Sequence, residues 1–573
     1  MMKISNILLA CTLAAIFTVG CKPAFYHEIT AAELEESIGF MASDSLKGRF
    51  PGTEEDSVLT AYISRMMDIS GLVHAGANGI QEVKVESGYT ITSKNNLKVK
   101  DLVLNTVRDS KFKVFGFSAT DTVEAEIIYM GRTNDLQVLK DDVQGMILFT
   151  PLPDSLPSND YDAYNYLRTA SLKAADLGIA GLIYTYSGDP GSFDNPKRLS
   201  LPVPVAALDS EHAAELLSLE SAEALHRLYE SNKVVRSGQK ARLETEVIPM
   251  ELTTYNTVNM LKGAKKELSG QYIIIGAHHD HLGMGGRGSS SRRQDTIAVH
   301  YGADDNASGV AGVIELAQNI MSRSPARSFL FTTFAAEELG LFGSKTFAND
   351  PLVPLDSVQL MINLDMIGRL NEDRQLQIGG IGTSPVFRSM IDTLNKKANF
   401  SIAYSEAGFG PSDHSSFYAK DVPVLFITTG AHPDYHTPAD TPDKINYEGM
   451  VEVLSFVSDL AINLAELPEK IPFTEAGPKE SSGSRGRAGM VTFGLMPDVM
   501  YDGNDGMPVS FVTEGKPAAI GGMKSGDIIT SVDGKSIGNV YDYMDRLSNL
   551  KEGQSVVVTV KRDGTKIDLL LKL

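Results

Sequence analysis

Three histidines and an aspartate follow directly on an apolar run in the stretch YIIIGAHHDHLG, residues 272–283. The whole chain has eleven histidines, so three of them within four residues is a marked concentration. An imidazole or a carboxylate can hold a proton or coordinate a divalent metal ion. Because the apolar run has the length of a buried strand, we predict a strand that ends at a group of candidate ligands, His278 first among them.

Three further apolar runs of strand length lead to side chains of the same kind. SFLFTTFAA precedes Glu337 and Glu338, VQLMINL precedes Asp365, and VPVLFITTG precedes a segment with His432 and His436. Continuous apolar runs that alternate with helices are typical of strands buried on both faces. Sites of open α/β sheets form beyond the carboxyl ends of the strands, so we expect these side chains to meet at one sheet edge.

A helix entrance is expected to bring two more carboxylates to this edge. In GADDNASGVAGVIELAQNIM, Ser308 can cap a helix, which places Asp304 and Asp305 at its start. The apolar face of this helix consists of Val310, Val313, Ile314, Ala317 and Ile320. Each candidate alone has an ordinary structural explanation, since Asp-Asp-Asn is a common turn. Their convergence predicts a site, because two histidines and three carboxylates suit two divalent ions about 3.5–4 Å apart that share one carboxylate.

The motifs H-x-D, D-D-N-A-S-G, E-E-L-G, N-L-D-M and Y-H-T-P-A-D-T occur in this order within residues 278–441. In order and spacing they resemble the co-catalytic zinc aminopeptidases, a metallopeptidase family that also includes glutamate carboxypeptidases and glutaminyl cyclases. LKGRFPGT at 46–53 resembles the opening segment of that family. The resemblance implies an α/β zinc-exopeptidase fold, in which a mostly parallel core sheet is flanked by helices.

The resemblance also implies a role for each ligand. His278 and Asp365 would bind one zinc ion, Glu338 and His436 would bind a second, and Asp305 would bridge the two ions. Two zinc ions lower the pKa of a shared water and polarise the scissile carbonyl group.

Two further carboxylates have implied catalytic roles. Glu337 would be the general base that takes the proton of the water and later hands it to the leaving amine. Asp280 would hold the imidazole of His278 from outside the ligand shell and fix its tautomer.

Other residues near these motifs are expected to be less directly involved. His279 and His281 are not ligands by this correspondence, and His281 is expected to line the site or pack under it. Asp413 and His414 in GPSDHSSF are candidate substrate contacts. His432 is expected to be structural, and Asp304, outside the bridge, is expected to tolerate substitution better than Asp305.

The N-terminus resembles the signal of a bacterial lipoprotein. Met1-Met2-Lys3 is followed by the apolar core ISNILLACTLAAIFTV and then by Gly20-Cys21, which matches the lipobox. The resemblance implies a signal at residues 1–20, lipid attachment to Cys21 and an extracytoplasmic location, with the outer membrane favoured. A plain signal peptide and an uncleaved anchor are the alternatives.

Composition divides the remaining chain into blocks. Residues 25–96 and 246–470 are expected to form the peptidase domain, which opens with a helix that Thr30 and Glu33 start as a capping box.

Residues 97–245 resemble a protease-associated domain, a small α/β module inserted in secreted peptidases. Residues 475–487 are a Gly/Ser-rich linker. Residues 488–573 resemble a PDZ domain, because KPAAIGGMKSGDIITSVDGKSI fits the pattern of that family except for Gly521-Gly522-Met523.

The formal charge of −20 argues against a nucleic-acid partner, which needs a basic face. The expected partners are peptide substrates, a peptide or protein ligand of the PDZ domain, and the membrane through the lipid on Cys21. An aminopeptidase is the favoured function. A carboxypeptidase of the same family would need a cation for the terminal carboxylate, for which Arg369 is a candidate. An inactive receptor or scaffold is the third alternative, although no ligand is missing.

Overall fold

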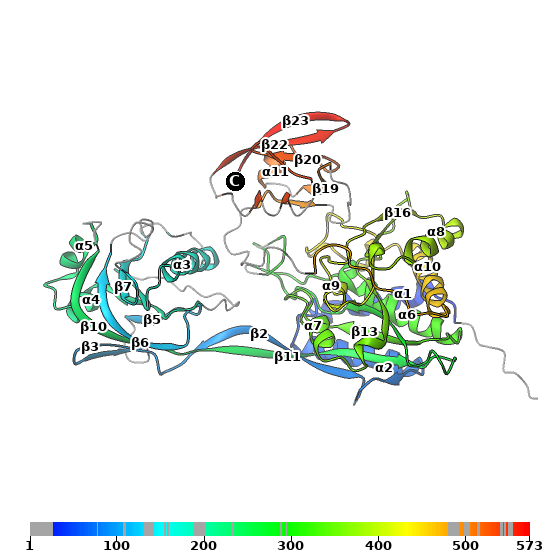
Figure 1. The fold of residues 1–573 in the computed structure, drawn as a ribbon, viewed down its shortest axis with the longest axis horizontal. Helices are drawn as coiled ribbons and strands as arrows, with labels where there is room; N and C mark the ends of the chain where they lie inside the picture. Colours follow the sequence, from blue (N-terminus) through cyan, green and yellow to red (C-terminus); the bar gives the residue numbers. More distant parts are fainter. Residues whose placement is uncertain are drawn as a thin grey trace, which may run out of the picture.

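The computed structural model describes residues 27–573 except 77, 107–110, 131–142, 154–155, 157–159, 188–200, 231–233, 287–288, 294, 480–491, 498–504, 513–515, 539–541, 544–545, 548–549 and 551–553. The predicted signal, Cys21 and residues 480–487 of the predicted linker lie outside this part. No helix among the described residues is long and apolar enough to cross a membrane. The described residues are organised around a nine-stranded, an eight-stranded and a six-stranded sheet (Figure 1).

The nine-stranded sheet has four parallel strands at its centre. Their order is β13 (Ser328–Phe334), β12 (Tyr272–His278), β14 (Val358–Leu364) and β17 (Val424–Thr428). Antiparallel to β13 runs β11 (Val247–Leu261), which also pairs with β1 (Val73–His74) and β2 (Ile80–Ile91). Beyond β17 lie β15 (Gln375–Gly379) and β16 (Ser401–Tyr404). The apolar runs that predicted strands therefore form the parallel centre of a mixed sheet.

Helices cover both faces of this sheet because its central strands are apolar at successive positions. Ile273 and Ile275 of β12 share a core with α1 (Ala31–Met41), α2 (Glu54–Ile69), α6 (Gly309–Ser322), α8 (Phe387–Ala398) and α10 (Tyr447–Ala465). Ile274 points to the opposite face and packs with residues of α7 (Phe342–Asn349) and α9 (His414–Tyr418). Because side chains alternate along a strand, each central strand contributes residues to the hydrophobic core on both faces of the sheet.

The predicted capping box starts α1. Glu33 N donates to Thr30 Oγ1 over 3.3 Å, and Thr30 Oγ1 donates to Glu33 Oε2 over 2.6 Å. Leu34, Ile38 and Met41 are buried on the inward face of the helix, as their spacing predicts.

A two-stranded ribbon formed by β2 and β11 leads from the nine-stranded sheet to the eight-stranded sheet (Figure 1). The eight-stranded sheet has the order β4 (Leu102–Asn105), β3 (Asn96–Val99), β10 (Val235–Thr245), β6 (Asp121–Tyr129), β7 (Ile147–Pro151), β8 (Gly181–Tyr186), β9 (Val205–Asp209) and β5 (Phe112–Val114). Its helices are α3 (Asp160–Ala175), α4 (Ser210–Leu216) and α5 (Ala222–Glu230). It is an inserted α/β body with its own hydrophobic cores on both faces.

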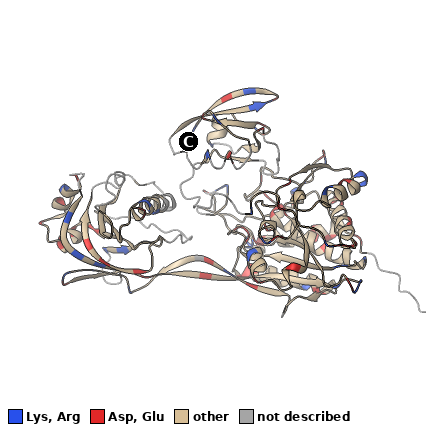
Figure 2. Ribbon diagram, viewed as in Figure 1, with Lys and Arg blue, Asp and Glu red and all other residues tan. Residues whose placement is uncertain are grey.

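The C-terminal sheet is antiparallel and has a separate core that includes Phe493, Ile529 and Val558. It consists of β18 (Leu495–Pro497), β19 (Met507–Val512), β20 (Ile528–Val532), β21 (Lys535–Ser536), β22 (Ser555–Arg562) and β23 (Thr565–Lys572), with the short helix α11 (Pro517–Ile520). Acidic and basic positions are interspersed along the elements of all three sheets (Figure 2).

Candidate metal centre

The candidate ligands lie at the carboxyl ends of the four parallel strands. His278 is the last residue of β12, Asp365 follows β14, and Glu337 and Glu338 come shortly after β13. β17 leads through a loop to His436. Since the four strands run in the same direction, their carboxyl ends share one sheet edge. The structure brings all the predicted ligands together at this edge.

Asp305 lies between two groups of ligands. His278 Nε2 is 3.2 Å from Asp305 Oδ1 and 3.6 Å from Asp365 Oδ1. On the other side, His436 Nε2 is 3.1 Å from Asp305 Oδ2 and 3.2 Å from Glu338 Oε1. Ligands about 2.0–2.2 Å from a tetrahedral ion are themselves about 3.4 Å apart. A carboxylate whose two oxygens face different histidines over such distances has the geometry of a bridging ligand.

The balance of charge in this cluster fits bound cations. His278 and Asp305 are 1% and 3% exposed, and in the described part of the chain the ion pairs of Asp305, Glu338 and Asp365 are with histidines only. His281 Nε2 is buried and forms no hydrogen bond with any described residue. Buried carboxylates and orphaned polar atoms are costly unless a partner compensates them, and a divalent metal ion would do so.

The two candidate histidine ligands present the same ring nitrogen to this space. His278 Nδ1 donates to the carbonyl oxygen of Asp280 over 3.2 Å, and His436 Nδ1 donates to the carbonyl oxygen of Ser290 over 3.0 Å. Burial alone would lower the pKa of His278, but the charges of Glu337 and Asp365 and the contact with Asp305 raise it well above its ordinary value. Both imidazoles therefore sit in a strongly negative field with Nε2 directed at carboxylates.

The carboxylate of Asp280 does not hold His278, contrary to the prediction. Its nearest oxygen is 3.9 Å from His278 Nδ1, and the backbone carbonyl group of Asp280 accepts the hydrogen bond instead. The two carboxylate oxygens accept from Glu337 N over 2.9 Å and from Glu338 N over 3.3 Å. Asp280 thus fixes the turn that carries both glutamates, and its main chain fixes the tautomer of His278.

His281 lies closer to the ligands than the sequence indicated. Its Nδ1 is 2.9 Å from Glu338 Oε1 and 3.8 Å from Asp305 Oδ2. With these two carboxylates it forms a group whose ligand atoms are within 4.8 Å of one another. The expectation that His281 lines the site therefore agrees with its position, and the hydrogen bond to Glu338 orients that carboxylate.

Glu337 has an environment different from that of Glu338. Burial, followed by the charges of Glu338, Asp413 and Asp365, raises the pKa of Glu337 well above its ordinary value. Burial and Asp305 also oppose ionisation of Glu338, but His436 and His281 outweigh them and hold its pKa at about 2. Two adjacent, chemically identical side chains are thus tuned in opposite directions, which suits a proton acceptor and a ligand.

Asp305 is held by a side chain that the sequence did not single out. Asp440 Oδ2 accepts from Asp304 N over 2.9 Å and from Asp305 N over 3.1 Å. Asp440 Oδ1 is in turn 3.1 Å from the guanidinium group of Arg369. Asp440 is the acidic residue of the Y-H-T-P-A-D-T motif, so the motif supplies both a candidate ligand and a support for the bridge.

One expectation about the segment Ala303–Ser308 (η3) is wrong. Ser308 does not cap α6 through its side chain, because its hydroxyl donates to the carbonyl oxygen of Asp304; Asn306 Oδ1 accepts from Gly309 N instead. Asp304 remains, as a prediction, the more tolerant neighbour of the bridge. It is fully buried, and its carboxylate accepts from Gly368 N over 2.6 Å and lies 3.2 Å from His432 Nε2.

A buried arginine, Arg49, holds main-chain carbonyl groups next to the candidate ligands. The sequence analysis did not identify it. Arg49 is 1% exposed, and its guanidinium group donates to the carbonyl oxygens of Met41, His279, Tyr301, Gly302 and Asp305. Gly302 has a φ of 54°, and a Cβ atom there would lie 2.7 Å from Arg49 Nη2. Arg49 belongs to LKGRFPGT, the segment that resembles the opening of the family. Nothing in that segment indicates which carbonyl groups its arginine would contact.

Three further side chains line the surroundings of the centre. Tyr435, also missed in the sequence, stacks on His436 with ring centroids 3.8 Å apart, and burial and the charge of Asp305 raise its pKa well above the ordinary value. Its phenol is therefore a donor. Asp413 is fully buried, and desolvation raises its pKa to about 7. His414 stacks on Phe426, and desolvation lowers its pKa to about 3.

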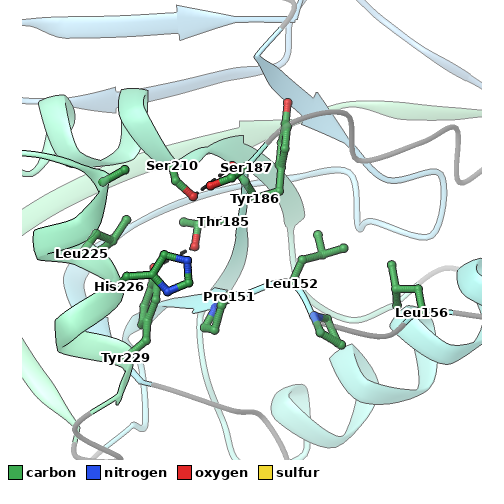
Figure 3. Close-up of a pocket in the computed structure, with 12 residues that line it drawn as sticks. Pro151, Leu152, Leu156, Thr185, Tyr186, Ser187, Ser210, Leu225, His226 and Tyr229 are labelled. Carbon is green, nitrogen blue, oxygen red and sulfur yellow. Dashed lines mark hydrogen bonds between the residues drawn. The ribbon is translucent and has the colours of Figure 1, made fainter.

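A cavity of about 380 Å³ lies in the inserted body, away from these ligands in the fold. It opens at the ends of β7 and β8 and is lined by residues that include Pro151, Tyr186, Ser210 and His226 (Figure 3). Among the described residues, its lining contains one histidine and no carboxylate.

Comparisons with known proteins agree with the motifs. Residues 256–461 match the model of peptidase family M28, and residues 493–573 match a PDZ domain. Uncharacterized protein YfbL of Escherichia coli (strain K12) is 30% identical over 279 residues, which are 43% of this chain and 82% of that protein. The probable leucine aminopeptidase of Arthroderma otae is 25% identical over 252 residues, 41% of this chain and 64% of that protein.

Two further matches are also named as aminopeptidases. Leucine aminopeptidase 2 of Trichophyton rubrum is 28% identical over 290 residues, 49% of this chain and 51% of that protein. The chain thus spans about half to two thirds of the length of these curated aminopeptidases. Among solved structures, the aminopeptidase from Aneurinibacillus sp. strain AM-1 is 24% identical with a TM-score of 0.43, and the match covers 78% of this chain and 96% of that one.

Proposed function

The chain belongs to peptidase family M28, and from that premise we propose that it is a two-metal aminopeptidase that removes N-terminal residues from peptides. The observation that carries the proposal is the position of Asp305, whose two carboxylate oxygens face His278 and His436 over 3.2 and 3.1 Å. His278 and Asp365 would hold one zinc ion, Glu338 and His436 the other, and Asp305 both. Bound zinc supplies a water of lowered pKa and a Lewis acid for the scissile carbonyl group.

The side chains of the protein supply the proton transfer, the positioning of the base and a hydrogen-bond donor. The raised pKa of Glu337 suits a carboxylate that takes a proton from water and returns it to the leaving amine. Asp280 holds the backbone of this glutamate through a 2.9 Å hydrogen bond to Glu337 N. The phenol of Tyr435 remains protonated and is available to donate to the substrate oxygen that gains negative charge.

The surroundings of Arg369 favour an aminopeptidase over a carboxypeptidase. A carboxypeptidase needs a free cation for the terminal carboxylate of the substrate. The guanidinium group of Arg369 lies 3.1 Å from Asp440 and 3.4 Å from Asp434, and the side chain is 17% exposed. Its charge is already compensated by two aspartates, and one of these supports the Asp305 segment. Withdrawing Arg369 to bind substrate would therefore disturb the bridge.

We expect the enzyme to hydrolyse peptides with a free amino terminus and a blocked carboxyl terminus, and to lose this activity on removal of metal. The measurement is the release of the N-terminal residue from an aminoacyl peptide amide, before and after treatment with a chelator and after addition of zinc. The matched substrate is the N-acetylated peptide with a free carboxyl terminus. Cleavage of this second substrate alone would indicate a carboxypeptidase, and cleavage of neither would indicate an inactive relative.

The PDZ domain is proposed to recruit a peptide or protein end by strand addition without taking part in the chemistry. Its contact with the peptidase body includes the guanidinium group of Arg292, 4.1 Å from the ring centroid of Phe511. Arg292 N also donates to the carbonyl oxygen of His436 over 2.9 Å. The side chain of Arg292 thus contacts the PDZ domain and also donates to the carbonyl oxygens of Pro433 and Tyr435, and its main chain supports a candidate ligand.

Deletion of residues 488–573 is expected to leave kcat/KM for small aminoacyl substrates unchanged, because the hydrogen bond that reaches His436 comes from the main chain of Arg292. The measurement compares the truncated and full-length proteins at equal zinc content. Phe511→Ala is the matched variant, since it removes the aromatic contact and keeps Arg292, whose guanidinium group also donates to the carbonyl oxygens of Pro433 and Tyr435. If the truncated protein binds its metal and still loses turnover, the PDZ domain takes part in catalysis and the separation of roles is wrong.

The location of the protein and the nature of the inserted body are also proposals. We propose that the body is a protease-associated domain and that the chain is a lipoprotein anchored through Cys21, on the basis of its Thr18-Val19-Gly20-Cys21 lipobox. Cys21→Ser is expected to move the protein from the membrane fraction to the soluble fraction, or to leave the signal uncleaved. Fractionation of the variant with the membrane after normal processing would contradict lipidation.

A further inference from the structure

A second cluster of metal-binding side chains lies where the start of α1 meets α6, outside the candidate metal centre. His27, Glu33 and Glu315 each offer a ligand atom, and these atoms lie within 4.8 Å of one another. His27 Nε2 is 3.3 Å from Glu315 Oε2. We propose that these three residues form a third metal site, which binds zinc and has no part in catalysis.

Burial of Glu315 is the first argument. Its side chain is 3% exposed and lies on a helix whose neighbouring residues Val313, Ile314 and Leu316 are buried in the core. Among the described residues, Glu315 forms an ion pair with His27. A carboxylate in such a position is stabilised by a cation placed among the three side chains.

The positions of the other two ligands are fixed by hydrogen bonds. The capping box holds the Glu33 carboxylate, since Thr30 Oγ1 donates to Glu33 Oε2 over 2.6 Å. Asn319, four residues after Glu315 on the same face of α6, donates from Nδ2 to the carbonyl oxygen of His27 over 2.7 Å. Hydrogen bonds from outside the ligand shell that orient each ligand are typical of metal sites.

The chemistry of the ligands selects the ion. One imidazole and two carboxylates suit zinc, whereas calcium and magnesium prefer sites made of oxygen alone. The 3.3 Å separation of His27 Nε2 and Glu315 Oε2 is close to the roughly 3.4 Å expected between two ligands of a tetrahedral zinc ion. Three protein ligands leave the fourth position for water.

The third site is distinct from the catalytic pair, although both use the region of α6. Glu315 is six residues beyond Gly309, where α6 begins after the Asp305 segment, which is about 9 Å along the helix axis. An ion bound by His27, Glu33 and Glu315 would fasten the segment before α1 to the body of the domain. The site does not depend on the proposed function.

The test is a count of zinc sites in the full chain. Protein stripped of metal with a chelator is titrated with zinc by equilibrium dialysis, and bound zinc is measured per chain. We expect three equivalents for the wild type and two for His27→Ala, with equal aminopeptidase activity after reconstitution. Glu33→Gln is the second variant, which should weaken binding of the same single equivalent, and an excess of calcium or magnesium should not displace it.

His74→Ala is the matched control. This histidine also pairs with a carboxylate, Asp68, over 2.6 Å, but it has no third ligand group in the described part of the chain, so three equivalents should remain. Equal zinc content in the wild type and His27→Ala would overturn the site and leave His27–Glu315 as an ordinary hydrogen bond. Loss of the His27-dependent equivalent in Asp305→Ala would also overturn it, because that ion would then belong to the catalytic centre.

Discussion

Glu337→Gln is expected to lower kcat by roughly 10²–10⁴-fold, the usual contribution of a positioned general base, while the zinc content stays at the wild-type value. Glutamine keeps the shape of the side chain and its hydrogen-bonding capacity but cannot accept the proton of water. The pKa of Glu337 is raised by burial and by the surrounding carboxylates, which outweigh the opposing charge of His278, whereas Glu338 is within 3.2 Å of two imidazoles. The measurement combines steady-state kinetics with metal analysis of the same preparation.

Glu338→Gln is the matched change at the adjacent position. Glu338 Oε1 lies 3.2 Å from His436 Nε2 and 2.9 Å from His281 Nδ1, so removal of its charge should weaken metal binding together with activity. If Glu337→Gln lost zinc and Glu338→Gln kept it, the two roles would be exchanged. If neither change had an effect, both residues would be ordinary glutamates at a turn.

Asp305→Ala is expected to reduce the zinc bound at the catalytic centre from two ions to one or none, and activity with it. The reason is geometric, because Asp305 Oδ1 lies 3.2 Å from one candidate ligand, His278 Nε2, and Asp305 Oδ2 lies 3.1 Å from the other, His436 Nε2. Loss of this one side chain would therefore remove a ligand from both proposed ions and leave two histidines without their shared carboxylate. Metal analysis of the purified variant, compared with the wild type, checks the expectation.

The control for this variant must be an exposed aspartate. Asp304 is unsuitable because it is fully buried and its carboxylate accepts from Gly368 N. Asp443, on the short turn Pro442–Lys444, is exposed and belongs to the segment that follows the last ligand motif. Asp443→Ala should keep full zinc content. Full occupancy of the catalytic centre in Asp305→Ala itself would contradict the bridging assignment.

The candidate ligands could be predicted because their signals are local. An apolar run that ends at His278, or one followed by Asp365, marks the end of a buried strand without reference to the rest of the fold. Parallel strands share an edge for their carboxyl ends, so identifying the runs was enough to expect convergence of the side chains that follow them. The capping box of Thr30 and Glu33 is local in the same sense, since both hydrogen bonds form within one turn.

The supports of the site depend on contacts between distant parts of the chain. The proton on His278 Nδ1 is held by a main-chain carbonyl group, and that of His436 by the carbonyl group of Ser290, 146 positions away. Every residue has a carbonyl group, so no residue type in the sequence marks the one that will accept. This is why the carboxylate of Asp280 was assigned to His278, when in the structure it accepts from the main-chain N–H groups of Glu337 and Glu338.

The amino-acid sequence alone was enough to predict the apolar runs that become the four parallel strands, the side chains that follow them and the start of α1, because strand length, apolar periodicity and capping are properties of neighbouring residues. The packing of distant segments established that Asn306 rather than Ser308 caps α6, that Arg369 is neutralised by Asp434 and Asp440, and that Arg49 donates to the carbonyl oxygen of Asp305. These depend on which hydrogen-bonding groups are left unpaired once the chain is packed. Burial makes each such group find a partner, and the partner is set by the fold rather than by sequence proximity.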